Sequence, residues 1–222
     1  MGSAMEAPRR YRGITASERR AQRRERLMDS GLELFGTKGY ANTSIRAICA
    51  AASMNSRYFY ESFTSREDLL FAVYRRIVTD IVASTTEATA AAETIEEQAR
   101  AGLQAGWTIL TEDRRKARVI ALEVVGVSDR LERLRRDTRH ALADLTARNA
   151  QAIAGSGSRF RLDPVLTTRS LIGAVVEILV DWINEDLNAS AEEIVEHFTR
   201  LFAAVAYAAV EPAPPERSTP RS

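Results

Sequence analysis

The sequence predicts an all-α protein of about nine helices, and three observations lead to this prediction. Nearly every segment repeats its apolar residues with the period of a helix, several segments open with a capping box, and none alternates like a half-buried strand. The 222 residues, 45% hydrophobic and 27% charged, have the composition of an ordinary globular chain that can bury a substantial core. We expect a three-helix N-terminal domain and a larger helical body.

The first predicted helix opens with a capping box from Thr15 to Glu18, in which the Thr hydroxyl and the Glu carboxylate each accept a backbone N–H. An apolar stripe at helical spacing follows, made of Leu27, Gly31, Leu34 and Phe35. Gly36 and Gly39 are predicted to end this helix, because glycine adopts a left-handed C-terminal turn at little cost.

Two short helices and one long helix are predicted next. The first short helix starts at 42–44 with Ile48 facing inward, and a turn at 53–55 ends it. The second covers about 55–62. Ser65 then provides the N-cap of a long helix that links this region to the body.

The body repeats this pattern, with helix starts at a capping box from Thr94, at Asp163-Pro164, and at a capping box from Ser190. Its helices are predicted over 95–111, 114–125, 129–154, 165–186 and 191–209. Four prolines after residue 210 predict a disordered tail. The expected domains are a flexible basic arm (1–14), a helix-turn-helix domain (15–64), a helical body (65–210) and a disordered tail (211–222).

Charge is unevenly distributed along the chain. Residues 1–60 contain eleven Lys and Arg against five Asp and Glu, a net charge of +6, and the remainder carries −5. A basic head on an acidic body indicates that only the head meets a polyanion such as nucleic acid. A solvated basic helix face is the alternative that the charge alone leaves open.

Composition and motifs disfavour several other classes of protein. Cys49 is the single cysteine and there are two histidines, so we expect a reducing, cytoplasmic location and no Cys/His metal site. No apolar run reaches the ~18 residues of a membrane span, so we expect no membrane partner. No Ser-His-Asp order, phosphate-binding glycine loop or paired carboxylates stand out, so we expect neither an enzyme nor a cofactor.

Residues 42–62 have the layout of a helix-turn-helix, whose second helix enters the major groove of DNA. This spacing is weak evidence alone, because any small helical bundle contains such pairs. The predicted outer face of the second helix strengthens it with Asn55, Ser56, Arg57, Tyr58 and Tyr60. Arginine can read guanine through two hydrogen bonds, and tyrosine and serine can reach phosphates or base edges.

The stretch of about fifty residues from Arg23 to Ile77 resembles the DNA-binding domain of the TetR family of transcription regulators. The matching residues, in order, are Leu27, Leu34-Phe35, Gly39-Tyr40, Thr43 to Arg46, Ile48, Phe59-Tyr60, Phe63 and Ser65 to Leu70. The chain departs from the family pattern at Ser53, where the family has Gly, and at Arg57, where a small residue is common. A positive φ at Ser53 would cost about 1 kcal/mol. The body resembles the family only in helical character and length.

The resemblance implies a pseudo-palindromic, double-stranded DNA operator as partner. The residues expected to contact it are Thr43, Ser44, Arg46, Asn55, Ser56, Arg57, Tyr58, Tyr60 and Arg66. Thr43 and Asn55 have a second interpretation as helix N-caps. The arginines between residues 19 and 26 can reach flanking phosphates, and a solvated helix face is again the alternative.

The segment 171–183 is apolar nearly all round, so this helix is predicted to bury two sides. The resemblance implies that a second copy covers one side in a homodimer, whereas a third layer of the same chain is the alternative. The residues expected at the dimer interface are Leu171, Val175, Ile178, Leu179, Phe198, Leu201, Phe202 and Val205.

The resemblance also implies a ligand cavity among the helices of residues 71–182. The candidate lining residues are Phe71, Tyr74, Trp107, Ile120, Glu123, Val124, His140 and Trp182, with ordinary core packing as the alternative for each. Glu123 lies within an apolar run, where a carboxylate needs a partner, water or a ligand.

These observations predict a ligand-responsive, sequence-specific DNA-binding regulator, a repressor that a small hydrophobic or amphipathic effector releases from its operator. The long fourth helix, which should touch both head and body, is the expected lever between the two sites. The alternative is an all-helical small-molecule binding protein or enzyme with no role on DNA. The residues identify neither the effector nor the operator.

Overall fold

The computed structural model describes residues 15–154 and 159–211, and these residues form the predicted all-helical fold. In this part of the chain nine α-helices are accompanied by one π-helical turn and one pair of two-residue strands. The elements are α1 (Ala16–Lys38), α2 (Ile45–Ala51), α3 (Ser56–Tyr60), α4 (Arg66–Thr89), α5 (Ile95–Thr111), α6 (Arg114–Arg118), η1 (Val119–Glu123), α7 (Asp129–Ala154), β1 (Arg159–Phe160), α8 (Pro164–Asn184), α9 (Ala191–Ala209) and β2 (Val210–Glu211).

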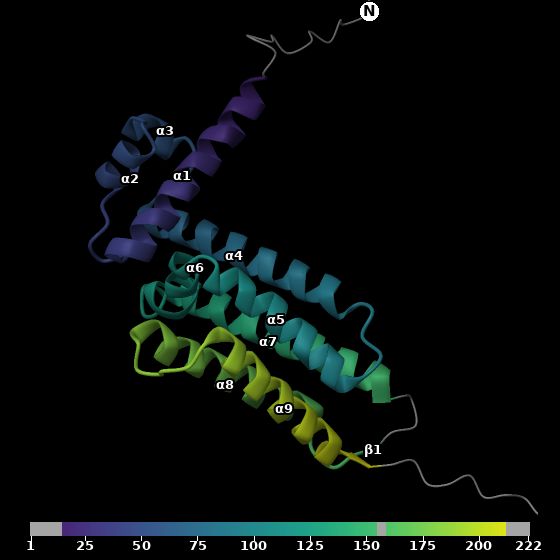
Figure 1. Ribbon diagram of the computed structural model, residues 1–222. Coiled ribbons are helices and arrows are strands. Elements are labelled where there is room, and N and C mark those ends of the chain that lie inside the picture. The colour runs from purple at the N-terminus through teal and green to yellow at the C-terminus, as the bar shows by residue number, and fades with distance from the viewer. Residues whose placement is uncertain (1–14, 155–158, 212–222) are drawn as a thin grey trace, which may run out of the picture.

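The chain divides into a head, formed by α1 to α3, and a body, formed by α4 to α9 (Figure 1). In the body the long helices run along a common direction, with α5 between α4 and α9, and with α7 packed on α8. The head sits at one end of these helices, where α1 contacts α4, α6 and η1. Signals between head and body must therefore cross this junction.

The predicted helix starts are present as hydrogen-bonded caps. Thr15 and Thr94 form the reciprocal capping boxes that open α1 and α5. Ser190 and Glu193 exchange the same pair of bonds before α9, and the Asp163 carboxylate accepts from the N–H of Leu166 at the start of α8. Local sequence therefore fixes where these helices begin.

The prediction that Gly36 ends the first helix is wrong, because α1 continues to Lys38 and ends at Gly39. Gly39 has a φ of 86°, which glycine adopts without strain, and its N–H donates to the carbonyl of Phe35. Gly36 instead lies where α6 crosses α1. A Cβ at this position would be 2.7 Å from the Cα of Arg115, so only glycine allows this close approach.

The continuous helix predicted over 114–125 is also wrong, because α6 gives way to the π-helical turn η1. In a π-helix residues five apart lie one turn above one another. Arg118 and Glu123 are five apart, and the Arg118 Nε donates to the Glu123 carboxylate at 2.8 Å. This ion pair therefore spans the turn and stabilises its wider winding.

The sequence gave no sign of strands, yet β1 and β2 form a short antiparallel pair that joins Arg159 to Glu211 and Phe160 to Val210. Strands of two residues are too short to show an alternating pattern. Glu211, expected in the tail, therefore belongs to this pair. The remaining tail (212–222), the basic arm (1–14) and the loop 155–158 lie outside the described residues.

One hydrophobic core runs through both parts of the molecule. In the head it contains the fully buried side chains of Phe35, Ile48 and Phe59. It continues along α4 through Leu69 and Val73 and reaches the body. None of the described helices is long and apolar enough to cross a membrane.

Candidate nucleic-acid interface and internal cavity

The helix-turn-helix is built by α2, a tight turn and α3. Ser44 caps α2 by accepting from the N–H of Ala47, and Asn55 caps α3 by accepting from the N–H of Tyr58. Ser53 in the turn has the positive φ of 54° that the family's glycine would suggest. The departure from glycine at this position therefore leaves the turn geometry intact.

The predicted reading face of α3 is open to solvent. Asn55, Ser56, Arg57, Tyr58 and Tyr60 are all exposed, as are Ser44 and Arg46 at the start of α2. The Arg57 side chain is 84% exposed, and its contact within the described residues is an i,i+4 ion pair with Glu61 at 3.2 Å. Tyr60 is 60% exposed. This face thus presents a guanidinium, phenols, a hydroxyl and an amide to a partner.

Two residues predicted to contact DNA are engaged inside the protein instead. Thr43 is 1% exposed, and its hydroxyl donates to the carbonyls of Gly39 and Leu34, so its side chain cannot reach DNA. Its suggested N-cap role belongs to Ser44. Arg66 is half-buried, donates to the Thr43 carbonyl and stacks 4.1 Å over the Tyr40 ring. Arg66 therefore ties α4 to the segment before α2.

The arginines of α1 also bind the helix-turn-helix from inside. Arg26 donates to the Ala52 carbonyl at 2.7 Å, and Arg24 donates to the Ser62 carbonyl and lies over the Phe63 ring. Arg23 lies 4.7 Å over the Tyr58 ring. These side chains complete carbonyls at helix C-termini, which helices leave without an internal partner. The positive charge of the head is therefore partly structural.

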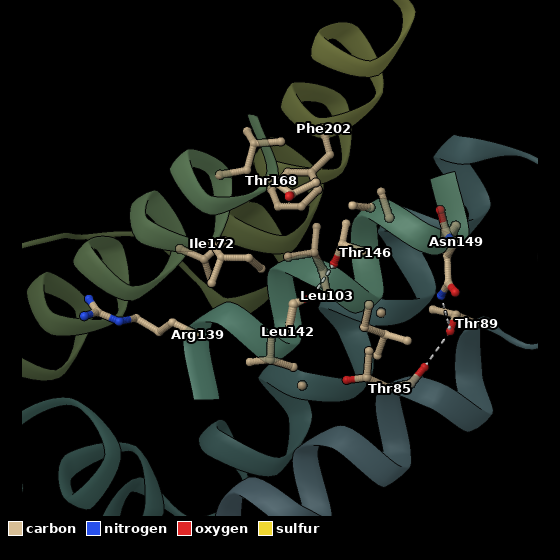
Figure 2. Close-up of a pocket in the computed structure, with 18 of the residues that line it drawn as sticks. Thr85, Thr89, Leu103, Arg139, Leu142, Thr146, Asn149, Thr168, Ile172 and Phe202 are labelled. Atoms are coloured by element: carbon tan, nitrogen blue, oxygen red, sulfur yellow. Dashed lines mark hydrogen bonds between the residues drawn. The ribbon is translucent and has the colours of Figure 1, made fainter. Parts of the chain in front are cut away.

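The body encloses a cavity of about 230 Å³ between α4, α5, α7, α8 and α9 (Figure 2). On α5 the wall extends from Ile95 to Leu110, roughly 22 Å at the rise of an α-helix. Most wall residues are apolar, including Leu103, Leu142 and Ile172. The cavity is therefore elongated along the helices and suited to an apolar molecule.

The polar groups of the cavity wall differ in what they can still bind. Thr89, Thr138, Thr146 and Thr168 each donate to the carbonyl four residues earlier, so their hydroxyls can only accept further bonds. Burial raises the pKa of Tyr74 above its ordinary value, against the opposing effect of a hydrogen bond with Thr138, so its phenol stays protonated.

Three of the eight predicted ligand-binding residues line the cavity: Tyr74, Trp107 and Ile120. The other five, Phe71, Glu123, Val124, His140 and Trp182, lie outside its wall. Phe71 packs under the Arg130 guanidinium, Val124 is fully buried, and Trp182 packs edge-on against Trp107 with 6.1 Å between ring centres. The apolar pattern marked these residues as buried but could not distinguish a cavity wall from solid core.

Glu123 finds its partners at the junction of head and body. One carboxylate oxygen accepts from the backbone N–H of Tyr40 at 2.6 Å, and the other accepts from Arg118. Nearby, Arg115 pairs with Glu33 of α1 and with Asp113. Hydrogen bonds from Arg115 hold the pKa of Asp113 below its ordinary value, despite partial burial. The carboxylate of Glu123 therefore joins the two parts instead of meeting a ligand.

The predicted dimer interface faces inward in the structure. Leu171, Val175, Leu179, Phe202 and Val205 line the cavity. Phe198 is buried in the core, and Ile178 and Leu201 are half-buried and packed against it. The two buried sides predicted for 171–183 are thus accounted for within this chain, by core on one side and cavity on the other.

Several polar residues of the cavity wall were missed by sequence reasoning, namely Thr85, Gln98, Arg139 and Asn149. A polar residue on an amphipathic helix is ordinarily assigned to solvent. The available signal was the Gly102–Gly106 spacing, which leaves room for Thr85 and Thr89 of α4 against α5. This spacing marks the face of α5 that turns toward the cavity.

Comparison with known proteins agrees with this geometry. Residues 27–73 match the family model for bacterial regulatory proteins of the tetR family. A TetR/AcrR-family regulator from Thermobifida fusca has a TM-score of 0.63 at 26% identity, over 82% of this chain and 97% of that one. The regulator FadR from Bacillus subtilis, solved with stearoyl-CoA, has a TM-score of 0.74 at 17% identity, over 81% and 97%.

A second FadR, the fatty acid degradation regulator from Bacillus halodurans, shares the fold with a TM-score of 0.73 at 19% identity, over 82% of this chain and 94% of that one. The matched segment covers α2, α3 and the start of α4, which are the elements that carry the exposed reading face. The chain belongs to the TetR family of bacterial transcriptional regulators.

Proposed function

We propose that this protein is a cytoplasmic, sequence-specific repressor that an effector bound in the body cavity releases from its operator. The observation that carries the proposal is the turn η1. Ile120 contributes to the cavity wall, and Glu123, three residues later, holds the Tyr40 N–H of the head. A ligand that displaces Ile120 would therefore act on the head through a few bonded atoms.

The helix α4 provides a second route, as the lever expected from the sequence. Its first residue, Arg66, holds the Thr43 carbonyl just before α2, and its residues from Tyr74 to Thr89 line the cavity. A ligand that moves the cavity-lining part of α4 would thus tilt the α2–α3 unit. Both routes require that the ligand binds the released conformation more tightly than the DNA-bound one.

The proposed effector is amphipathic. The cavity wall is mainly apolar, and Arg139 makes no ion pair with any described residue, so it can bind an anionic group. Figure 2 shows its side chain extending away from the other labelled residues. The Bacillus subtilis regulator with the same fold, solved with stearoyl-CoA, supports a ligand with a long apolar part and a negative charge.

DNA reading by this fold calls for two heads, and we propose a homodimer formed by the outward faces of α8 and α9. These faces carry Leu166 and Tyr207, which are exposed apolar side chains, and the small residues Gly173 and Ala204. A Cβ at Gly173 would meet nothing within 4 Å, so this face is open for a second copy to approach. The two α3 helices would then read half-sites about one turn of DNA apart.

The test is a mobility-shift assay with the DNA upstream of the protein's own operon, followed by a thermal-shift screen of metabolites and operator binding with each stabilising hit. Tight binding to one sequence and its loss with a hit are the expected results. Binding no tighter than to random DNA at every salt concentration would instead support the alternative, a helical small-molecule binding protein without a DNA role. Hits that leave operator affinity unchanged would contradict ligand-driven release.

A further inference from the structure

One end of the cavity contains polar side chains that the protein leaves without partners. Gln98 of α5 lines the cavity and is 7% exposed. Its side-chain amide makes no hydrogen bond with any described residue. Burying an amide without a partner is unfavourable, so a molecule in the cavity is expected to supply one.

Gln98 lies at the same end of the cavity as Asn149 of α7. A Cβ at Gly102 would be 3.3 Å from the Thr89 side chain, which shows that this face of α5 packs on Thr89. Gln98 precedes Gly102 by one turn on the same face. The Asn149 amide donates to the Thr89 hydroxyl at 3.4 Å (Figure 2). Gln98 and Asn149 therefore flank Thr89 from two helices.

The unused bonding capacity at this end is neutral. The Thr89 hydroxyl is occupied, because it donates to the Thr85 carbonyl and accepts from Asn149. The Asn149 carbonyl oxygen and the whole Gln98 amide remain, and they offer both donors and acceptors. The charged residues of the cavity wall are Arg135 and Arg139, and Arg139 lies roughly 15 Å from Asn149 along α7. An uncharged polar group matches this end, and an ion does not.

We propose that the Gln98–Asn149 end binds a neutral oxygen function, a hydroxyl or a carbonyl, at the remote end of an elongated amphiphile. The inference rests on the proposed function, since it places this group on the same effector, and it narrows the effector to molecules oxygenated at the end away from Arg139. A plain alkyl end would leave the Gln98 amide buried and unpaired, and sites with such amides discriminate against it.

The test compares hexadecanoic acid with its counterpart that carries a hydroxyl on the terminal carbon, and dodecanoic acid with its own hydroxylated counterpart. Binding to the full chain is measured by calorimetry and by the emission of Trp107, which lines the cavity, and Trp182, which packs against it. In the pair whose length fits, the hydroxylated acid is expected to bind about tenfold more tightly.

Two variants show whether Gln98 is responsible. Gln98→Leu keeps the approximate size and removes the amide, so the preference should disappear while the plain acid binds equally well or better. This variant should also melt no lower than the wild type, because it removes an unpaired buried group. Gln104→Leu, at an exposed position of the same helix, is the matched control and should retain the full preference.

Equal affinity within both pairs, a preference that survives Gln98→Leu, or no binding by any of the four acids overturns the inference. Operator affinity separates this result from the proposed function. If the hydroxylated acid binds with the expected preference but leaves operator affinity unchanged, ligand-driven release fails and the inference stands. If an effector lacking any such oxygen releases the operator and binds Gln98→Leu equally well, the proposed function stands and the inference fails.

Discussion

The head and the body of this protein differ in what their buried positions pack against. In the head, Phe35, Phe59 and their neighbours fill the interior completely, and arginines of α1 complete the carbonyls at the ends of the short helices. In the body, apolar residues with the same helical spacing surround an elongated cavity. Periodicity therefore identifies a buried position, but it does not show whether that position faces a neighbour, an empty space or a second subunit.

The largest expected effect comes from placing the same charge on either side of the body wall. Leu179 is 3% exposed and lines the cavity, so Leu179→Glu buries an unpaired carboxylate. We expect it to lower the free energy of unfolding by about 4 kcal/mol or more. Urea unfolding followed by circular dichroism measures this change.

Ala204→Glu is the matched control on the exposed side of α9. It should change the stability of the folded chain by no more than about 0.5 kcal/mol, and under the proposed dimer it should produce monomers in light scattering. A well-folded, dimeric Leu179→Glu variant would contradict the inward assignment of this helix face and restore the interface that the sequence predicted.

The junction between head and body should respond next. Glu123→Ala leaves the Tyr40 N–H without its acceptor and removes a bond to Arg118. We expect a loss of about 1–3 kcal/mol in the free energy of unfolding, together with a weaker effect of ligand on operator affinity. Thermal unfolding and operator titrations measure the two, with Glu112→Ala at an exposed site as control. Unchanged coupling in Glu123→Ala would leave α4 as the route.

On the reading face, Arg57→Ala should leave the fold intact, because the side chain is largely exposed. If Arg57 reads a base, operator affinity should fall by about 1–3 kcal/mol and the preference at one base position should relax. Fluorescence anisotropy with a set of operator variants resolves this. An equal loss on all sequences would assign Arg57 to phosphate, and no loss would mean that α3 is not the reading helix.

The smallest effect concerns acid. Arg115 lowers the pKa of Asp113 below its unfolded value, so this pair contributes stability above the ordinary range near pH 3.8 and loses it as the pH falls through the lower, folded pKa. Because Arg115 is 43% exposed, we expect less than about 1 kcal/mol. Asp113→Asn should flatten the acid limb of the stability curve, and an unchanged limb would show that the pair contributes nothing.

The sequence predicted most of the head because its signals are local. Capping residues such as Thr15, Asn55 and Ser65 fix helix starts through bonds within three residues, and the structure has them where the sequence placed them. The failures involve contacts distant in sequence. Gly36 was read as a helix stop because Arg115 could not be foreseen beside it, and Glu123 was read as a ligand group because its partner Tyr40 belongs to the head.

The wider winding of η1 makes its residue count part of the junction. Each residue advances an α-helix by roughly 100°, so deleting one residue between Val119 and Glu123 would turn everything after the deletion by that angle relative to α6. The carboxylate that faces Tyr40 would then point away from the head, although every side chain needed for the contact would still be present. Transmission across this junction thus depends on helical phase as much as on residue identity, and a one-residue length change here is a sharper alteration than most substitutions.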